Sequence, residues 1–306
     1  MTKGQNNSEK VPFLTKLAYG MGDTGTAAAA SIRSFFFLYF LTDVAGLNPV
    51  LAGAVLMVNK LWDAVNDPLI GSLSDHLPTR WGRRRPWFLL GALPFALTFF
   101  FLYRVPALSQ WGKFAYYLVA SFLFDLAYTA VNVPYAALAP ELTSDYHERT
   151  VLNKYRFAVS IIVGLLAALL HQQIVGAVQR SGGLEAKGYM FSTIFWGSIS
   201  ILTFVFAFAG TYERYHPEKP KRFKVFSGFL ATWQNQGFRL LAGVHMLSWM
   251  AVQIVSSIIV YYMKYWLKRP ELTSLILLAV QGSALLWLFL WTILSRRLGK
   301  KAIFQW

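Results

Sequence analysis

The sequence contains no cysteine and few charged residues. Because none of its 306 residues is cysteine, it gives no indication of a redox compartment. Charged residues make up 14% of the chain, whereas a soluble domain carries about a quarter. This shortage excludes a soluble enzyme and a soluble nucleic-acid-binding protein. The polar N-terminal segment MTKGQNNSEK also lacks the apolar stretch of a signal peptide, so we expect it to be retained.

Acidic residues are scarce as well, with 14 Asp and Glu against 29 Lys and Arg and a net charge of +15. Most of the bases fall at the N-terminus, in alternate connectors between apolar segments, and in the C-terminal tail. Lys and Arg accumulate in cytoplasmic loops of membrane proteins. The pattern therefore predicts a multi-pass protein of a plasma or inner membrane with both termini in the cytoplasm. The bilayer, and not nucleic acid, is its expected partner.

Apolar residues dominate, at 56% of the chain, and several apolar runs exceed the 18 residues that a membrane-spanning helix needs. The predicted fold is therefore an all-α polytopic membrane protein. We expect eight spans, at 17–41, 49–74, 87–103, 112–139, 152–178, 189–211, 238–263 and 272–294.

The connectors predict a division into two bundles. We expect a cytoplasmic N-terminus at 1–16, a six-helix bundle at 17–211, a cytoplasmic linker at 212–237 and the start of a second bundle at 238–306. A weak repeat supports this division, because GSLSDHLPTRWGRRR (71–85) after span two resembles LSRRLGKKA (294–302) after span eight. Repeated bundles are typical of secondary transporters. A full second bundle would need four more spans, so we expect a truncated chain; a natural short form and a non-transporting fragment remain alternatives.

Two acids interrupt the second span, in WDAVNDPLI (62–70). Asp63 and Asp67 are four residues apart and so share one helix face, with Lys60 on that face and Asn66 beside it. Carboxylates and an amide oxygen at this spacing suit Na⁺, and neighbouring carboxylates also suit a shared proton. An alternative is an ion cluster that only holds helices together. Asp67, which precedes Pro68, has the further alternative of satisfying backbone groups at a kink.

Other charges inside the spans have more than one interpretation. Asp23 lies in GMGD (20–23), the short motif of intramembrane aspartyl proteases, for which Asp125 is the conceivable partner; we favour a transporter helix instead. Arg156 lies early in span five, where it either extends to the interface or reaches a central cavity.

The loop after span two carries a second charged motif. Its members are Asp75, Arg80, Gly82, Arg83 and Arg84. One interpretation is ordinary positive charge on a cytoplasmic loop. The other is an ionic latch that holds neighbouring helices together when the site faces outward and breaks when it opens inward, with Gly82 permitting a tight turn.

These motifs together resemble the major facilitator superfamily, and within it the glycoside–pentoside–hexuronide:cation symporters. The resemblance covers the first six spans well and the second half only in outline. It rests on YGMGD (19–23), FLTDVAGL (40–47), WDAVNDPLIG (62–71), TRWGRRRPW (79–87), YTAVNVPYAALAPELT (128–143), HERT (147–150) and YRF (155–157).

The resemblance implies a major facilitator-type bundle and symport of a sugar or glycoside with Na⁺ or H⁺ by alternating access, with no catalytic residue and no cofactor beyond the coupling ion. It implies a cation site of Asp63, Asn66, Asp67 and Thr129, as in the melibiose permease branch, and a sugar-proximal Arg156.

The melibiose-type sugar site departs from this pattern. Ala27 and Asn132 stand where that branch has acids, and Ala136 stands where it has a sugar-stacking Trp. Asp23 and Asp125 are candidate replacements, so the substrate-binding candidates are Arg156, Asn132, Asp23 and Asp125. Because related carriers of lysolipids have a similar cation motif, a lysolipid or other lipid remains the alternative substrate.

Overall fold

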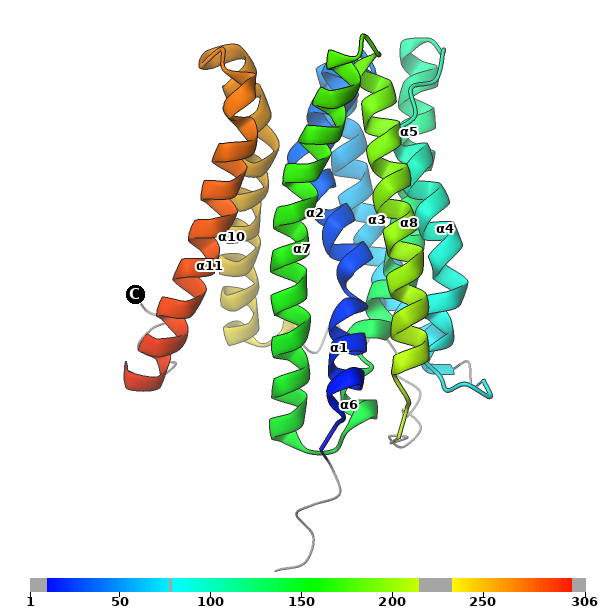
Figure 1. Cartoon of the computed structure of the whole chain (residues 1–306), viewed down its shortest axis with the longest axis vertical. Helices are drawn as coiled ribbons and strands as arrows, with labels where there is room; N and C mark the ends of the chain where they lie inside the picture. Colours follow the sequence, from blue (N-terminus) through cyan, green and yellow to red (C-terminus); the bar gives the residue numbers. More distant parts are fainter. Residues whose placement is uncertain (1–9, 77–78, 215–232, 299–306) are drawn as a thin grey trace, which may run out of the picture.

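The structure, a computed structural model, describes residues 10–76, 79–214 and 233–298. Long α-helices cover all eight predicted spans, so the predicted all-helical fold is confirmed (Figure 1). Their bounds are Phe13–Met21 (α1) with Thr24–Tyr39 (α2), Pro49–His76 (α3), Pro86–Leu102 (α4), Gln110–Ala136 (α5), Tyr146–Arg180 (α7), Glu185–Gly210 (α8), Gln236–Tyr261 (α10) and Thr273–Leu298 (α11).

Within the described residues, five helical segments are long and apolar enough to cross a membrane: Phe13–Val44, Gln110–Ala136, Tyr146–Arg180, Glu185–Gly210 and Gln236–Trp266. The helix α4 is apolar but shorter. The helix α3 is long, but polar and charged side chains interrupt it at Asn59, Lys60, Asp63, Asn66 and Asp67. Such residues are costly in a bilayer, so their presence in one helix marks it as functional.

The first span is bent where Gly22 and Asp23 separate α1 from α2. A Cβ atom on Gly22 would lie 2.9 Å from the ring of Tyr135 and 3.2 Å from Ala207. Glycine therefore permits the close approach of three helices at the bend. Beyond α2 the span continues as a π-helical turn, Phe40–Val44 (η1).

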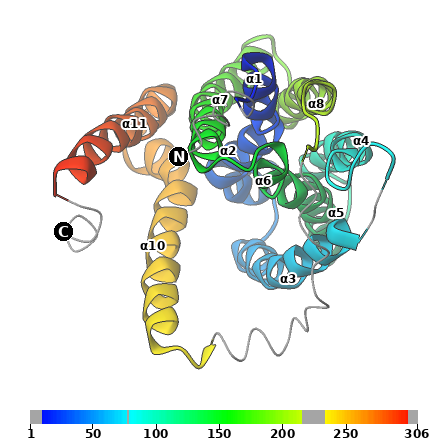
Figure 2. The ribbon, with the colours of Figure 1, turned by 90° about the horizontal axis from the view of Figure 1, so that it is seen from below.

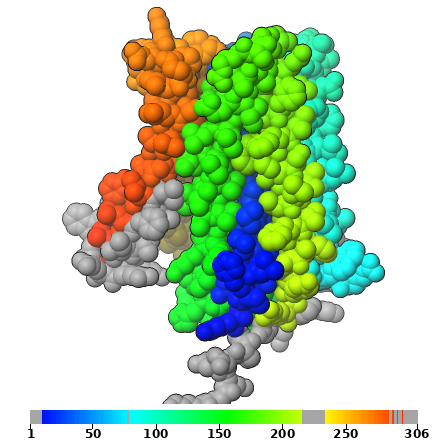
Figure 3. Space-filling model, in the orientation of Figure 1, coloured from blue at the N-terminus to red at the C-terminus, as the bar shows by residue number. Residues whose placement is uncertain are grey.

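The first six spans pack as one bundle. The helix α2 packs against α7 and α8, α4 lies between α5 and α8, and α3 packs on α5. One face of the molecule shows α1, α7 and α8 in continuous contact (Figure 3). The short helix Ala139–Leu142 (α6) joins α5 to α7.

The last two spans flank this bundle, with α10 against α2 and α11 against α7 (Figure 2). A π-helical turn, Tyr262–Trp266 (η2), ends α10, and a 3₁₀ turn, Pro270–Leu272 (η3), precedes α11. Most of the predicted linker (215–232) and the end of the second basic repeat (299–302) lie outside the described residues. The predicted domain boundaries therefore stay predictions.

The turns η1 and η2 meet at one end of the molecule, opposite the loop 79–85 (Figure 1). The carboxylate of Asp43 accepts hydrogen bonds from Tyr265 Oη and, at 3.4 Å, from Lys264 Nζ. The hydroxyls of Thr42 and Tyr261 lie 2.7 Å apart. We call this set of contacts the η1–η2 contact; it ties the first span to the seventh.

Candidate functional site

A cavity of about 300 Å³ lies between α2, α3, α5 and α10. Most of the residues that line it carry polar side chains, and they come from both the six-span bundle and α10. Its lining residues include Arg33, Asn59, Lys60, Asp63, Asp67, Phe124, Asp125, Thr129, Asn132 and Ser257. A cavity of this size and polarity suits a small polar ligand.

The cavity brings together three of the four predicted cation ligands. Asp67 and Thr129 are in direct contact, because Thr129 Oγ1 donates to Asp67 Oδ1 at 2.9 Å. Asp63 lies one helical turn from Asp67, and its Oδ2 accepts from Lys60 Nζ at 3.0 Å. The contact of α3 with α5 holds these side chains at one wall. Two carboxylates and a hydroxyl are oxygen donors of the kind that hard cations prefer.

Asn66, the fourth predicted ligand, points elsewhere. Its side chain is buried, its Nδ2 donates to the backbone carbonyl of Asp125 at 3.1 Å, and it is not part of the cavity lining. In this conformation Asn66 therefore ties α3 to α5 and offers no ligand from the cavity side.

Asp125 pairs with Arg33, a contact that the sequence does not reveal. The guanidinium of Arg33 forms two parallel hydrogen bonds with the carboxylate, one of them from Nη2 to Oδ2 at 3.2 Å. The rings of Phe37 and Phe124 lie 5.7 and 5.5 Å from the guanidinium carbon. Bidentate pairing and flanking rings fix the orientation of Arg33, and both charges line the cavity.

Asp23 and Arg156 form a second pair, outside the cavity lining. Arg156 Nε donates to Asp23 Oδ2 at 3.3 Å, and its guanidinium lies 4.7 Å from the ring centre of Tyr135. Thr26 Oγ1 donates to the other carboxylate oxygen at 2.7 Å. Of the predicted substrate candidates, the structure thus brings Asp125 and Asn132 to the cavity and pairs the other two with each other. Asp23 and Asp125 bind different arginines and only Asp125 lines the cavity, an arrangement unlike two acids that share one proton in an aspartyl protease site.

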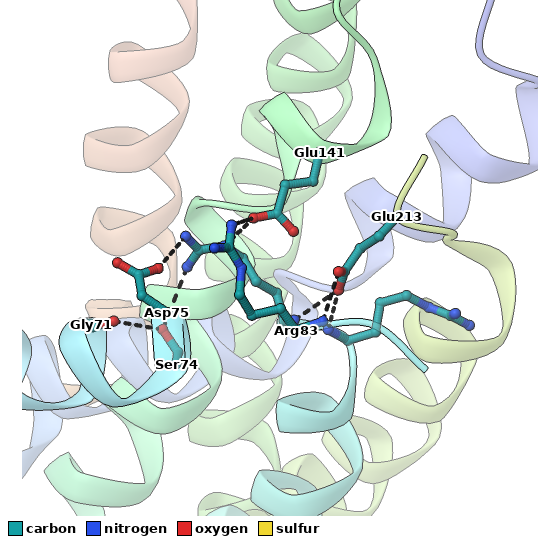
Figure 4. A network of polar contacts seen from close by, with 8 residues as sticks. Gly71, Ser74, Asp75, Arg83, Glu141 and Glu213 are labelled. Carbon is teal, nitrogen blue, oxygen red and sulfur yellow. Dashed lines mark hydrogen bonds and ion pairs between the residues drawn. The ribbon is translucent and has the colours of Figure 1, made fainter. Parts of the chain in front are cut away.

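The loop after α3 forms an ion network with acids from other elements (Figure 4). Arg84 Nη2 donates to Asp75 at 2.6 Å and Arg84 Nε to Glu141 at 2.7 Å. Arg83 donates to the same Glu141 oxygen at 2.6 Å. Glu141, a buried residue of α6, was not identified from the sequence, although it lies within the quoted APELT segment.

Glu213, which follows α8, binds the backbone of the same loop. Its carboxylate accepts from the N–H groups of Arg83 and Arg84 at 2.7 Å and of Arg85 at 3.0 Å. Gly82 has φ +105, and a Cβ there would lie 2.4 Å from the Glu213 carboxyl carbon. Glycine is therefore needed twice: it adopts this positive φ without strain, and it leaves room for the Glu213 carboxylate. Arg80 lies over the ring of Trp81 at 4.5 Å. All these partners belong to the first six-span bundle and the residues just after it.

Comparison with known proteins gives a consistent result. A family model described as "MFS/sugar transport protein" matches residues 18–306. The uncharacterized symporter sll1374 of Synechocystis sp. is 34% identical over 97% of this chain and 70% of its own length. The isoprimeverose transporter of Lactiplantibacillus pentosus is 27% identical over 95% of this chain and 61% of its length. The sodium-dependent lysophosphatidylcholine symporter 1-A of Danio rerio is 34% identical over 58% of this chain and 33% of its length.

Proposed function

The chain belongs to the family of MFS/sugar transport proteins, and on that premise we propose that it carries a sugar or glycoside together with Na⁺ or H⁺ by alternating access. It is an integral multi-pass membrane protein of a transporter family and not an enzyme. The proposal includes cytoplasmic termini and no cofactor other than the coupling ion.

One observation carries the proposal: the paired Asp67 and Thr129, together with Asp63, share a polar cavity with Asp125 and Asn132. Cation and substrate candidates in one cavity allow binding of one to favour binding of the other, which is the requirement for symport. Acids cost free energy inside a membrane, and a coupling ion gives these acids a function.

Uptake into proteoliposomes tests the proposal, with radiolabelled isoprimeverose as the first probe because a relative is named for it. We expect an inward Na⁺ or proton gradient to drive uptake above the level without a gradient. Asp63→Asn should abolish this stimulation, because it removes a carboxylate while keeping the side-chain size. If neither ion gradient nor Asp63→Asn changes the rate of uptake, coupling of substrate transport to the cation is contradicted.

A lysolipid is the second candidate substrate, and the Danio rerio relative is the observation that favours it. The charged and amide side chains that line the cavity favour the sugar, because hydroxyl groups can complete their hydrogen bonds and an acyl chain cannot. Competition decides between the two: we expect excess isoprimeverose, and not lysophosphatidylcholine, to reduce uptake of the labelled sugar. Gradient-driven uptake of labelled lysophosphatidylcholine by a protein that takes up no isoprimeverose would assign the lipid.

A further inference from the structure

Asn59 has an unusual position in the cavity wall. It lies on α3 one turn before Asp63, and its side chain is 1% exposed. Neither its amide nitrogen nor its amide oxygen has a hydrogen-bond partner. The great majority of buried side-chain polar groups are hydrogen-bonded, so an unpaired amide that lines a cavity points to a ligand that completes its bonds.

The neighbours of Asn59 identify which ligand it serves. Its amide lies close to the carboxylate of Asp125, without a hydrogen bond of normal geometry between them, and Arg33 holds that carboxylate. Asp67 lies eight residues further along α3, which is about 12 Å along the helix axis. Two ligands of one cation are only about 5 Å apart, so this backbone separation places Asn59 away from the Asp67–Thr129 pair. It belongs instead with Arg33 and Asp125.

The charges around the cavity limit the substrate further. Two cations, Arg33 and Lys60, and three carboxylates, Asp63, Asp67 and Asp125, line the wall. One bound monovalent cation therefore makes the lining neutral, and a substrate bearing its own carboxylate would leave an excess negative charge next to Asp125. Only two of the five Arg33 N–H groups bond to Asp125, so Arg33 keeps donors for hydroxyl oxygens.

We infer that Arg33, Asn59 and Asp125 form the substrate-contacting site and that it takes an uncharged sugar, whose hydroxyls complete the hydrogen bonds of the Asn59 amide. The inference rests on the proposed function and deepens it. The carboxylate accepts from a hydroxyl, while the guanidinium and the amide donate, which is the mixed donor and acceptor set that hydroxyl groups require.

Two matched probes and two variants test the site: phenyl β-D-glucoside and phenyl β-D-glucuronide, which differ in one carboxylate, with Asn59→Ala and the control Asn153→Ala on an exposed turn of α7. Binding is followed by tryptophan fluorescence of the full chain in saturating Na⁺. We expect the wild type to bind the glucoside at least about tenfold more tightly than the glucuronide. Asn59→Ala should raise the glucoside half-saturation concentration about tenfold, and Asn153→Ala should leave it unchanged.

A separate Na⁺ titration of each variant distinguishes the possible failures. If Asn59→Ala changes the Na⁺ concentration at half-saturation less than twofold, Asn59 contacts the sugar. Loss of Na⁺ binding in a folded Asn59→Ala variant would instead identify Asn59 as a cation ligand and overturn the assignment.

If the wild type binds the glucoside and Asn59→Ala binds it equally well, the inference fails while the proposed function stands. If the wild type binds lysophosphatidylcholine but neither glycoside, both fail. Should Asn59→Ala not fold, Asn59→Ser, which keeps a hydroxyl, replaces it, and a change below twofold there overturns the site.

Discussion

The carboxylate of Asp43 and the ammonium of Lys264 lie 3.4 Å apart and join the first span to the seventh. Lys264 also donates to Tyr39, Tyr265 donates to Asp43, and Tyr261 packs edge-on against Tyr39, so the η1–η2 contact joins the two spans at one end of the molecule. At the opposite end, the described partners of the arginine loop all come from the first six-span bundle and the residues just after it. The two networks therefore differ: one joins the six-span bundle to the end of α10, and the described partners of the other lie within that bundle and just after it.

Breaking the η1–η2 contact should open the cavity at that end. The natural chain has no cysteine, so Ser257→Cys in the cavity wall gives a single reporter thiol. We expect Asp43→Asn to raise its rate of labelling by a membrane-impermeant maleimide at least about threefold, because removing one charge loses the ion pair. The exchanged pair Asp43→Lys with Lys264→Asp should restore the slow rate. Equal rates in all three proteins would show that the contact does not restrict access.

Removing the shared acid of the arginine-loop network should destabilise the first bundle. Glu141 is buried and receives hydrogen bonds from both Arg83 and Arg84. Glu141→Gln leaves these charges without their partner, at a cost of about 3 kcal/mol. We expect a fall of several degrees in the apparent melting temperature in detergent. The exposed Glu271→Gln is the control. A Glu141→Gln protein with the same melting temperature as that control would show that the network does not stabilise the bundle.

A side chain at Gly82 should disrupt the Glu213 contact. Gly82→Ala combines a positive φ with a Cβ 2.4 Å from the Glu213 carboxyl carbon, so it should lower the melting temperature. Gly53→Ala is the matched control, because no atom lies within 4 Å of its added Cβ and Ala favours the helix. Equal thermal stability of the two variants would contradict the geometry of this turn.

The start of α7 provides a prediction about pH. Hydrogen bonds from the backbone N–H groups of Glu148 and His147 hold the pKa of Asp145 below its usual value. A lowered folded-state pKa stabilises the protein above the unfolded-state pKa of 3.8, and this contribution is lost as the pH falls through the lowered value. We therefore expect wild type to melt above Asp145→Ala at pH 7 and the difference to shrink below about pH 4.

Ser109→Ala serves as the comparison for this cap. Ser109 caps α5 by accepting from the N–H of Gly112 at 3.3 Å, and a hydroxyl does not titrate in this range. The effect of Ser109→Ala should be the same at pH 7 and pH 4. If the loss of melting temperature caused by Asp145→Ala is also the same at both pH values, the charge of Asp145 plays no part in capping α7.

The helices were predictable because long apolar runs dictate membrane spans. The charged residues were predictable as a group, since each is costly in a membrane. Their partners were not, because pairing depends on how helices rotate against one another. Asp125 was therefore identified without Arg33, and Arg83 without Glu141. Asn66 was placed by its spacing beside Asp63, but the packing of α3 on α5 turns its amide toward the Asp125 carbonyl.

The role proposed for Asn59 could not be predicted from the sequence either. In the sequence it is one amide in an apolar run, and nothing distinguishes it from a residue at a lipid surface. Only the packing of α3 shows that it is buried, unpaired and next to Asp125.

The most direct test of the account is Na⁺ titration of the purified chain, followed by tryptophan fluorescence. Trp62 precedes Asp63 and stacks on Phe122 at 5.1 Å, so it lies close enough to report ion binding. We predict a saturable signal in the wild type that Asp67→Asn and Thr129→Ala each shift to at least about tenfold higher Na⁺, with Asp75→Asn, outside the cavity, unchanged. A saturable signal that survives Asp63→Asn and Asp67→Asn together would contradict a cation site at the acid pair.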